Sequence, residues 1–264
     1  MTDESNCCAR LGRAVNAEKR STPCEEFGGA PPSLTSPYHT GPQHFVDVSI
    51  LKFEYETRAE NVARLVPNVF EVPDKPKAFV SFNYWGFSNV GTYTEVVQSV
   101  ECTYRNETFF YPVRLYLDND RAILAGREGF GIPKLTGVID FDIAATQPTM
   151  SAKLERPKGI LLVAGVFQAD NFVGENNELV VRNWGLRVWP KAGRTQGIVE
   201  LLKYKMTFTK GTIWSGLGSV GFTGFSAIDP LHELPVIEMT SSTLLRCSQM
   251  QLDIEDQQRI GAAG

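Results

Sequence analysis

The stretches AFVSFNY (residues 78–84) and TYTEVVQSVECT (residues 92–103) decide the fold class of this chain. Both are rich in β-branched and aromatic residues, which favour strands over helices. A third stretch, FFYPVRLYL (109–117), is followed by DND (118–120) and then by RAIL (121–124). Two apolar runs around a short polar turn are typical of a hairpin. The sequence therefore predicts consecutive antiparallel strands here, with residues 121–124 as the return strand of the last hairpin.

Strand-like runs continue on both sides of this region. Upstream, Val46, Val48 and Ile50 alternate with the period of a strand. Downstream, the strand-like runs are 137–143, 151–155, 160–167, 178–189, 199–209, 211–215 and 235–250. Short strands at regular spacing predict an antiparallel β-rich barrel or sandwich rather than an alternating array of strands and helices. The expected class is mainly β (α+β), with a few short helices.

A short helix is expected before the central strands. Thr57 and Glu60 have the spacing of a capping box, and Pro67 would end the helix about two turns later. The glycine-rich stretch at residues 216–224 lacks the strand-to-helix context and the Lys-Ser/Thr pair of a nucleotide-binding loop. We therefore expect turns and bulges there.

The chain divides into three segments by composition. Residues 1–36 are polar and contain Pro-Pro and Gly-Gly pairs, so we expect a flexible N-terminal arm. Residues 37–253 carry the strand-like runs and are expected to form a single domain, followed by a C-terminal tail at residues 254–264. A length of 264 residues is sufficient for one large domain with a substantial core.

Composition excludes several classes of function. The net charge is −4 without a basic block, which argues against nucleic acid or an anionic membrane as a partner. No apolar run is long enough to span a membrane, and the polar N-terminus lacks the apolar core of a signal peptide. The five cysteines form no Cys-x-x-Cys pair, so we expect free thiols in a cytoplasmic protein. None of the three histidines has zinc-ligand spacing, so neither a metal nor another cofactor is expected.

The stretch GREGFGIPKL (residues 126–135) is the most distinctive part of the chain. Its three glycines and its proline are typical of a loop that approaches a ligand closely. Lys134 stands between Pro133 and Leu135, so its surroundings are apolar. Burial disfavours a charged ammonium, and a neutral amine is the form that attacks a ketone. The local sequence alone does not single out this lysine, because most lysines are solvated.

Several short motifs in the same order resemble the acetoacetate decarboxylase family. The strongest is Gly-Arg-Glu at residues 126–128 followed by Pro-Lys at residues 133–134. The others are LTSP (34–37), GP (41–42), YTE (93–95), YLDN (116–119), Trp214 and PLHELPVIE (230–238). The resemblance extends over about residues 33–252. It implies a closed cone or barrel, a homo-oligomer, Lys134 as the Schiff-base lysine and Glu95 as an active-site glutamate.

The chain departs from the pattern of this family at three positions. Leu135 stands where the family usually has a second lysine. Val48 stands where the family has an arginine associated with the substrate carboxylate. A second family glutamate corresponds to a position near Ser81 or Asn83. These departures indicate a divergent member, and we expect one that serves secondary metabolism.

A valine cannot pair with a carboxylate, and an unpaired carboxylate is costly in an apolar pocket. Either Arg114 or Arg127 replaces the missing cation, or the substrate carries no carboxylate at that point. A structural role is the more frequent one for either arginine. The further residues that we expect to bind substrate, although each is more often a core residue, are Val48, Phe82, Asn83, Tyr84, Trp85, Tyr116 and Phe130.

Three hypotheses for the function follow. The first is decarboxylation of a β-keto acid through an imine on Lys134, with Glu95 assisting proton transfer. The second keeps the imine but performs aldol, dehydration or cyclisation chemistry on a polyketide-like carbonyl compound. The third is a non-catalytic barrel that binds a small molecule. All three predict a small-molecule partner.

Overall fold

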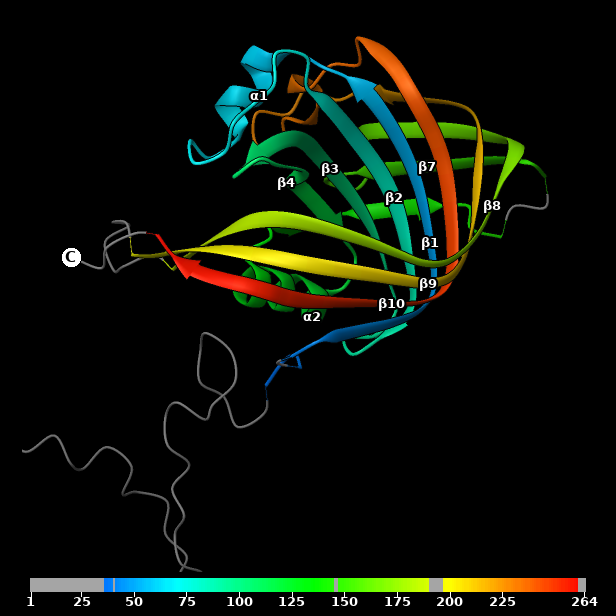
Figure 1. Ribbon diagram of the computed structural model, residues 1–264. Helices are drawn as coiled ribbons and strands as arrows, with labels where there is room; N and C mark the ends of the chain where they lie inside the picture. Colours follow the sequence, from blue (N-terminus) through cyan, green and yellow to red (C-terminus); the bar gives the residue numbers. More distant parts are fainter. Residues whose placement is uncertain (1–35, 40, 145–146, 190–196, 261–264) are drawn as a thin grey trace, which may run out of the picture.

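The computed structural model describes residues 36–39, 41–144, 147–189 and 197–260 (Figure 1). The arm expected at residues 1–36 therefore lies outside the described residues, apart from Ser36. The strands are β1 (Gln43–Glu56), β2 (Lys77–Ser88), β3 (Tyr93–Tyr104), β4 (Glu107–Leu117), β5 (Lys134–Thr136), β6 (Val138–Phe141), β7 (Thr149–Glu155), β8 (Leu161–Trp189), β9 (Ile198–Phe222) and β10 (Glu238–Arg259). The helical elements are α1 (Ala59–Leu65), α2 (Asp120–Leu124), a π-helical turn (Ala125–Gly129) and a 3₁₀ turn (Leu231–Glu233).

One ten-stranded sheet contains all of these strands, in the order β5-β4-β3-β2-β1-β10-β9-β8-β7-β6. The expected mainly-β class is confirmed. Neighbouring strands are antiparallel except β4 and β5, which run parallel. The edge strands β5 and β6 are consecutive in the chain and joined through Gly137, so the sheet must roll up to bring its two edges together. The sheet is rolled but not closed, because β5 and β6 form no hydrogen-bonded ladder, so the closed barrel that the family resemblance implies is not formed.

Gly137 occupies a place where a side chain would not fit. A Cβ atom there would lie 2.7 Å from Leu154 Cδ1 and 3.0 Å from Tyr116 Cβ, closer than carbon atoms normally approach. Glycine therefore allows the chain to pass from one edge of the sheet to the other between these two buried side chains.

Three strands are longer than the sequence predicts: in β8 and β9, runs expected to be separate strands are continuous, whereas β10 extends the single run expected at residues 235–250 to Arg259. Strand β8 has 29 residues, β9 has 25 and β10 has 22. Register shifts after Ala169 and after Phe172 let β8 bend, and Gly174 adopts a positive φ of 144° there. Figure 1 shows these three strands crossing the lower half of the molecule and then bending upward along its right-hand side. Strand β10 continues to Arg259, so the domain end expected at residue 253 falls inside a strand.

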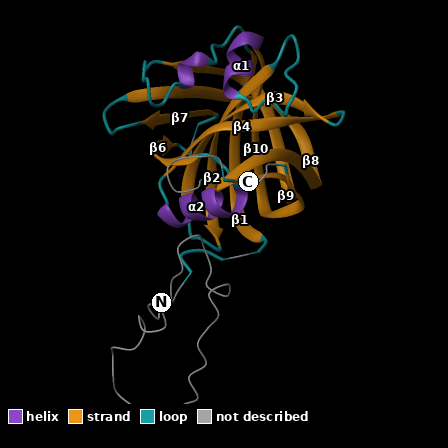
Figure 2. Cartoon of the chain, turned by 90° about the vertical axis from the view of Figure 1, so that its left-hand side faces the viewer, coloured by secondary structure: helices purple, strands orange, loops and turns teal. Residues whose placement is uncertain are grey.

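The prediction of a return strand at residues 121–124 is wrong. These residues form α2, because the Asn119 side chain accepts a hydrogen bond of 3.0 Å from the Ala122 amide and caps a helix. Asp120 adds a favourable negative charge in the first turn. The polar residues before the helix are therefore a helix start and not a hairpin turn. Figure 2 shows α2 and α1 at opposite ends of the sheet.

The helix expected near Thr57 is present as α1, but the capping box is not. Residue Arg58 occupies the N-cap position without a side-chain hydrogen bond, and the buried Thr57 hydroxyl has no hydrogen-bond partner. Helix α1 ends at Leu65, two residues before Pro67. The apolar stripe is sufficient to place this helix, with Val62 fully buried against the sheet.

Strands β1 to β4 separate two apolar cores, because side chains of a strand alternate between its faces. The first core contains Phe53, Phe82 and Val96. The second core contains Val48, Trp85 and Tyr93, and α2 covers it with Ala122. Residues from the curved halves of β9 and β10 close the second core: Phe208, Leu245, Cys247 and Met250. The two cores determine which residues can meet in a site.

Candidate active site

Lys134 is the first residue of β5 and is held in place by its own backbone. Its amide donates to the Ile132 carbonyl over 2.8 Å, and its carbonyl accepts from Arg127 Nη1 over 3.0 Å. Strand β5 pairs with β4 through Lys134 and Leu115. The π-helical turn packs directly against the lysine side chain at Gly126, where a Cβ would lie 2.4 Å from Lys134 Cδ. Glycine at this position leaves room for the lysine to extend into the second core.

Glu95 reaches the same place from β3 because of strand alternation. Tyr93 and Glu95 project to the second core, whereas Thr94 projects to the opposite face. Thr94 is anchored there by two hydrogen bonds to Asp118, one of 2.9 Å from its amide and one of 2.7 Å from its hydroxyl. These bonds fix the start of β3 against the end of β4. They also fix the direction in which the Glu95 side chain points.

The two predicted catalytic side chains are in contact. Lys134 Nζ lies 3.0 Å from Glu95 Oε1, and only 9% of the lysine side chain and 5% of the glutamate side chain are exposed. The contact is close, but its direction is not that of a good hydrogen bond, so Oε1 lacks a well-aligned donor. Lys134 Nζ also lies 5.6 Å from the centre of the Tyr93 ring, within the range of a cation–π contact. The amine and the carboxylate therefore form a buried, nearly dry pair.

A tryptophan that the sequence placed only as a pocket-lining candidate completes this cluster. Trp85 Nε1 donates to Glu95 Oε2 over 3.1 Å, so the two carboxylate oxygens have different neighbours. Tyr93 lies beside them, and its pKa is raised well above its usual value by burial and by the negative charges of Glu95 and Asp118. The phenol therefore stays neutral. Alternation along β3 would have placed Tyr93 beside Glu95, but no sequence signal gives the partner of Trp85.

Two positions that depart from the family pattern lie on the same face as this pair. Val48 is opposite Trp85 across β1 and β2 and is fully buried. Asn83 is opposite Glu95 across β2 and β3, and its buried Oδ1 atom has no hydrogen-bond partner. Both residues therefore lie on the face of the sheet that carries Glu95.

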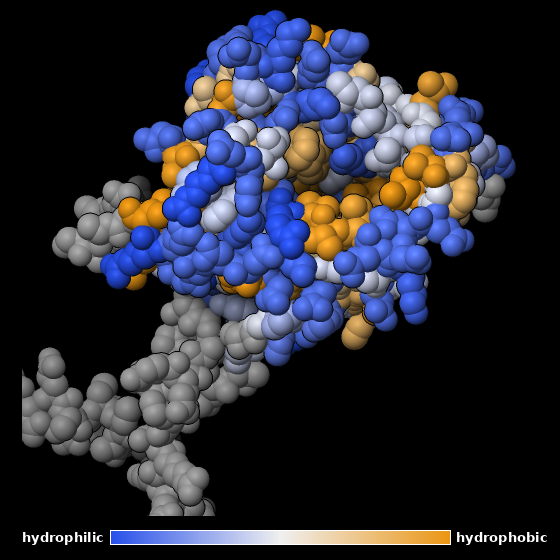
Figure 3. Space-filling view, viewed as in Figure 1, coloured by the Kyte–Doolittle hydropathy of each residue, from blue (hydrophilic) through white to orange (hydrophobic). Residues whose placement is uncertain are grey.

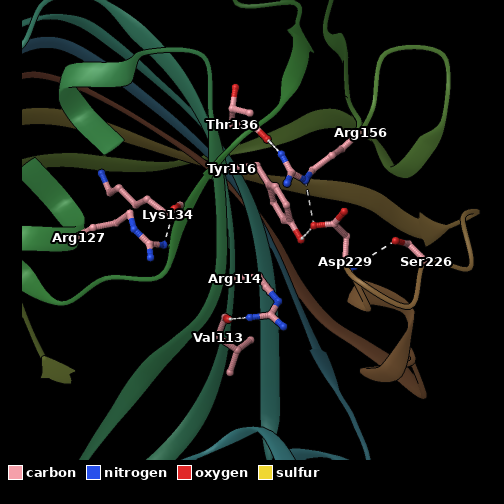
Figure 4. A network of polar contacts seen from close by, with 9 residues as sticks. All are labelled: Val113, Arg114, Tyr116, Arg127, Lys134, Thr136, Arg156, Ser226 and Asp229. Atoms are coloured by element: carbon pink, nitrogen blue, oxygen red, sulfur yellow. Dashed lines mark hydrogen bonds and ion pairs between the residues drawn. The ribbon is translucent and has the colours of Figure 1, made fainter. Parts of the chain in front are cut away.

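Four other expected substrate-binding residues lie on the opposite face, around the first core. Phe82 and Tyr116 are fully buried members of that core, and Tyr84 packs against it. Arg114 lies two residues before Tyr116 on β4, so it shares that face. Figure 4 shows Lys134 and Arg127 on one side of the ribbon, and Tyr116 with its partners on the other. The structure does not bring these four side chains to the lysine amine.

The side chains of the two arginines considered as substitutes for the family arginine make contacts away from the Lys134 amine. Arg127 is an exposed residue whose Nη1 atom is bonded to the Lys134 carbonyl, so it holds the loop. Arg114 has a buried Nε atom without a hydrogen-bond partner, on the far side of the sheet. The remaining candidate, Phe130, packs in a third cluster with Leu202 and Tyr204. It also borders a pocket of about 440 Å³ that Ala125 lines.

A separate polar network occupies the face that carries Tyr116. Tyr116 donates to Asp229 Oδ1 over 3.2 Å, and Arg156 Nε donates to the same oxygen over 3.0 Å (Figure 4). Burial and the Asp229 charge raise the pKa of Tyr116, so this phenol also stays neutral. Arg156 further donates to the Thr136 carbonyl. The network ties β4, β5 and the segment before the 3₁₀ turn together, which is a structural role.

Comparison with known proteins identifies the family. The profile described as acetoacetate decarboxylase (ADC) matches residues 30–256. The chain belongs to the acetoacetate decarboxylase family. Decarboxylase DEC1 of Cochliobolus heterostrophus is 29% identical over 230 residues, which cover 84% of this chain and 91% of that protein. An acetoacetate decarboxylase of Burkholderia cenocepacia is 26% identical over 221 residues, which cover 79% of this chain and 86% of that protein.

Solved structures show the same fold. An acetoacetate decarboxylase structure superposes with a TM-score of 0.76 at 20% identity, covering 90% of this chain and 96% of that one. The enduracididine biosynthesis enzyme MppR, in complex with pyruvate, superposes with a TM-score of 0.70 at 15% identity, covering 90% of this chain and 98% of that one.

Membership makes this chain an acetoacetate-decarboxylase-like enzyme, in a family that acts on small-molecule carbonyl compounds or keto acids. Among the described residues, no group of three His, Cys, Asp or Glu side chains could hold a metal ion. No helix in the described part of the chain is long and apolar enough to cross a membrane.

Proposed function

We propose that this enzyme decarboxylates a β-keto acid through a Schiff base on Lys134, with Glu95 as the proton-transfer partner. The observation that supports this most is the buried pair itself, with Lys134 Nζ 3.0 Å from Glu95 Oε1. A carboxylate at this distance can take a proton from the ammonium and return it later. The result is a neutral amine in apolar surroundings, which is the nucleophilic form.

The reaction follows from this arrangement. The neutral amine of Lys134 attacks the ketone carbon, and loss of water gives an iminium ion. The bond between the α-carbon and the carboxylate then breaks, its electron pair moves into the iminium, and CO₂ leaves. The resulting enamine is protonated on carbon, and water hydrolyses the imine to release the ketone and restore the amine. Glu95 is the group placed to move protons in the first and the last steps.

The burial of Lys134 and Glu95 supports this proposal in addition to the short distance between them. The second core excludes water from the pair, and Tyr93 and Trp85 form two of its walls. A low local dielectric strengthens the interaction of the iminium with the Glu95 carboxylate. The same environment disfavours early hydrolysis of the imine, since water has little access to it.

A second candidate function is imine chemistry on a neutral carbonyl compound without loss of CO₂, as in aldol, dehydration or cyclisation reactions. The observation that favours it is Val48, a fully buried apolar residue beside Trp85 on the face of the Lys134–Glu95 pair. A substrate carboxylate placed next to Val48 would lie unpaired in an apolar environment, at a cost of several kcal/mol. A neutral substrate would avoid this cost.

Product analysis separates the two functions. The enzyme is incubated with acetoacetate and with longer β-keto acids, and CO₂ release is measured together with the ketone formed. Decarboxylation predicts equal amounts of the two products, and their loss in a Lys134→Met variant that keeps its circular dichroism spectrum. An imine adduct with neutral carbonyl compounds, without CO₂ from any keto acid, would support the second function. No adduct and no turnover would leave a non-catalytic binding barrel.

We further propose that the enzyme is a homo-oligomer. Strands β8 and β9 expose large apolar side chains, among them Phe172, Val173, Trp214 and Leu217, and the centres of the Phe172 and Trp214 rings lie 5.0 Å apart at an interplanar angle of 55°. Apolar side chains also gather between the polar halves of the face shown in Figure 3. Sedimentation should give a mass above that of one chain, and Leu217→Lys should reduce it. A monomeric wild-type protein would contradict this proposal.

A further inference from the structure

We infer that Trp85 is a positioning residue for the reaction: its indole N–H holds one oxygen of Glu95 so that the other oxygen faces the Lys134 amine. This inference rests on the proposed function of Lys134 and Glu95. It assigns a role to a side chain that does not itself touch the reacting amine.

The two carboxylate oxygens of Glu95 contact different groups. Trp85 Nε1 lies 3.1 Å from Glu95 Oε2, and Lys134 Nζ lies 3.0 Å from Oε1. A carboxylate held by one oxygen has a restricted χ rotation, so the second oxygen has a defined direction. The contact between the amine and Oε1 is not aligned as a good hydrogen bond, so the amine does not fix the direction of Oε1. The hydrogen bond from the Trp85 indole to Oε2 fixes it.

The indole is rigidly placed. Trp85 is 5% exposed, and its ring packs against Phe45 at 4.7 Å and against Tyr93 at 6.0 Å between ring centres. Across the strand it faces Val48, a side chain small enough to leave room for the bicyclic ring. A tryptophan N–H is a donor without charge. It can therefore orient Glu95 without introducing a second cation that would compete with Lys134 for the carboxylate.

The charged and titratable groups around Glu95 come from three elements. Lys134 belongs to β5, and Tyr93 belongs to β3 and stays neutral, because burial and the charges of Glu95 and Asp118 raise its pKa. The turn Ala125–Gly129 packs against the other side of Lys134, where Arg127 donates to the Lys134 carbonyl and Glu128 accepts from the Tyr38 hydroxyl. The indole bond thus acts on a carboxylate whose main charged neighbour is the catalytic amine.

A pair of tryptophan variants tests the inference. Trp85→Phe keeps a buried ring and removes the donor. Trp184→Phe is the matched control, because Trp184 is a 4% exposed member of the first core whose Nε1 donates over 3.1 Å to Oε2 of Glu107, a carboxylate exposed at the surface. The rates of imine formation, measured by borohydride trapping, and the kcat and KM for a β-keto acid are determined as functions of pH for both variants.

The expected result is a loss of rate in Trp85→Phe with KM unchanged, and no change in Trp184→Phe. Loss of a hydrogen bond to a charged group corresponds to a loss of rate of about tenfold. A folded Trp85→Phe protein with the wild-type kcat across the pH range would overturn the inference. Absence of trapping in the wild-type protein would instead overturn the proposed function.

If Trp85→Phe does not fold, ¹⁵N-indole spectra of wild-type and Glu95→Gln proteins provide the test. The indole N–H resonance that belongs to Trp85 should shift upfield in Glu95→Gln, because its acceptor loses its charge, while that of Trp184 stays in place. An unchanged Trp85 resonance would show that the indole does not bond to this carboxylate and would overturn the inference.

Discussion

Substitution of Gly126 by alanine should reduce catalysis without destabilising the protein. A Cβ at this position would lie 2.4 Å from Lys134 Cδ and 2.6 Å from Cε, whereas carbon atoms pack at about 3.5–4.0 Å. The lysine side chain must therefore move by about 1 Å. Because its outer carbons are flexible, the movement costs little free energy of unfolding, and alanine in a helical turn offsets part of it, by up to about 1 kcal/mol. The amine, however, leaves its place beside Glu95.

A displacement of about 1 Å in a reacting group can lower a rate by about 10²-fold. We expect Gly126→Ala to slow imine formation by this order of magnitude, measured by borohydride trapping with a saturating carbonyl compound. Gly129→Ala is the matched control, since it lies in the same turn and a Cβ there would meet no atom within 4 Å. The reasoning would be refuted if the two variants formed the imine at the same rate while circular dichroism showed both to be folded.

Three further predictions follow from the buried pair and its surroundings. Lys134→Met should lower the free energy of unfolding by about 3–5 kcal/mol in urea titrations, because it leaves the buried Glu95 carboxylate unpaired. Adding Glu95→Gln should restore part of the lost free energy. A double variant as unstable as Lys134→Met would contradict the proposed pairing of the two side chains. Val48→Arg should lower the melting temperature, because Val48 is fully buried. Where the variant stays folded, it should favour small keto acids over neutral ketones. An unchanged or lower preference for keto acids would count against residue 48 as the position that faces the substrate carboxylate. Burial raises the pKa of Glu54, but the hydrogen bond from Lys52 and the charges of Lys52 and Lys77 outweigh burial, so the net pKa is lowered from 4.5. The stabilisation that the ionised Glu54 gives to the folded state is therefore present above pH 4.5 and is lost as the pH falls through the folded pKa. Glu54→Gln should flatten the acid limb of a plot of melting temperature against pH, and acid limbs of equal slope in the variant and the wild type would exclude Glu54 as a source of this pH dependence.

Much of the central sheet could be predicted from local composition. Strands β2, β3 and β4 correspond to the stretches 78–84, 92–103 and 109–117 that β-branched and aromatic residues indicated, except that β3 begins one residue later, at Tyr93. The lysine and the glutamate were paired by resemblance to the family, and alternation along β3 explains physically why Glu95 faces inward. The two residues lie 39 positions apart in the chain, a separation that only tertiary structure can bridge.

What could not be predicted depends on tertiary contacts. The Asn119 side chain decides that residues 121–124 are helical, although the apolar content of this segment also suits a strand. The continuity of β8 and β9 depends on bulges and glycines that let long strands bend, which sequence patterns read as breaks. The faces of Tyr116 and Trp85 depend on strand register, and a shift of one residue would exchange them. The sequence therefore did not predict the bond between Trp85 and Glu95, and the close approach of Gly126 to Lys134 depends on how the turn Ala125–Gly129 packs.

Every step of the proposed reaction requires that the Lys134 amine bonds covalently to the substrate. The most direct measurement is reduction with borohydride in the presence of a β-keto acid, followed by proteolysis and mass spectrometry of the modified peptide. We predict a single adduct on Lys134, with the mass of the decarboxylated ketone bound as a secondary amine and with loss of activity in proportion to labelling. An adduct on a different lysine, or continued turnover by an enzyme that cannot be trapped, would contradict the central claim.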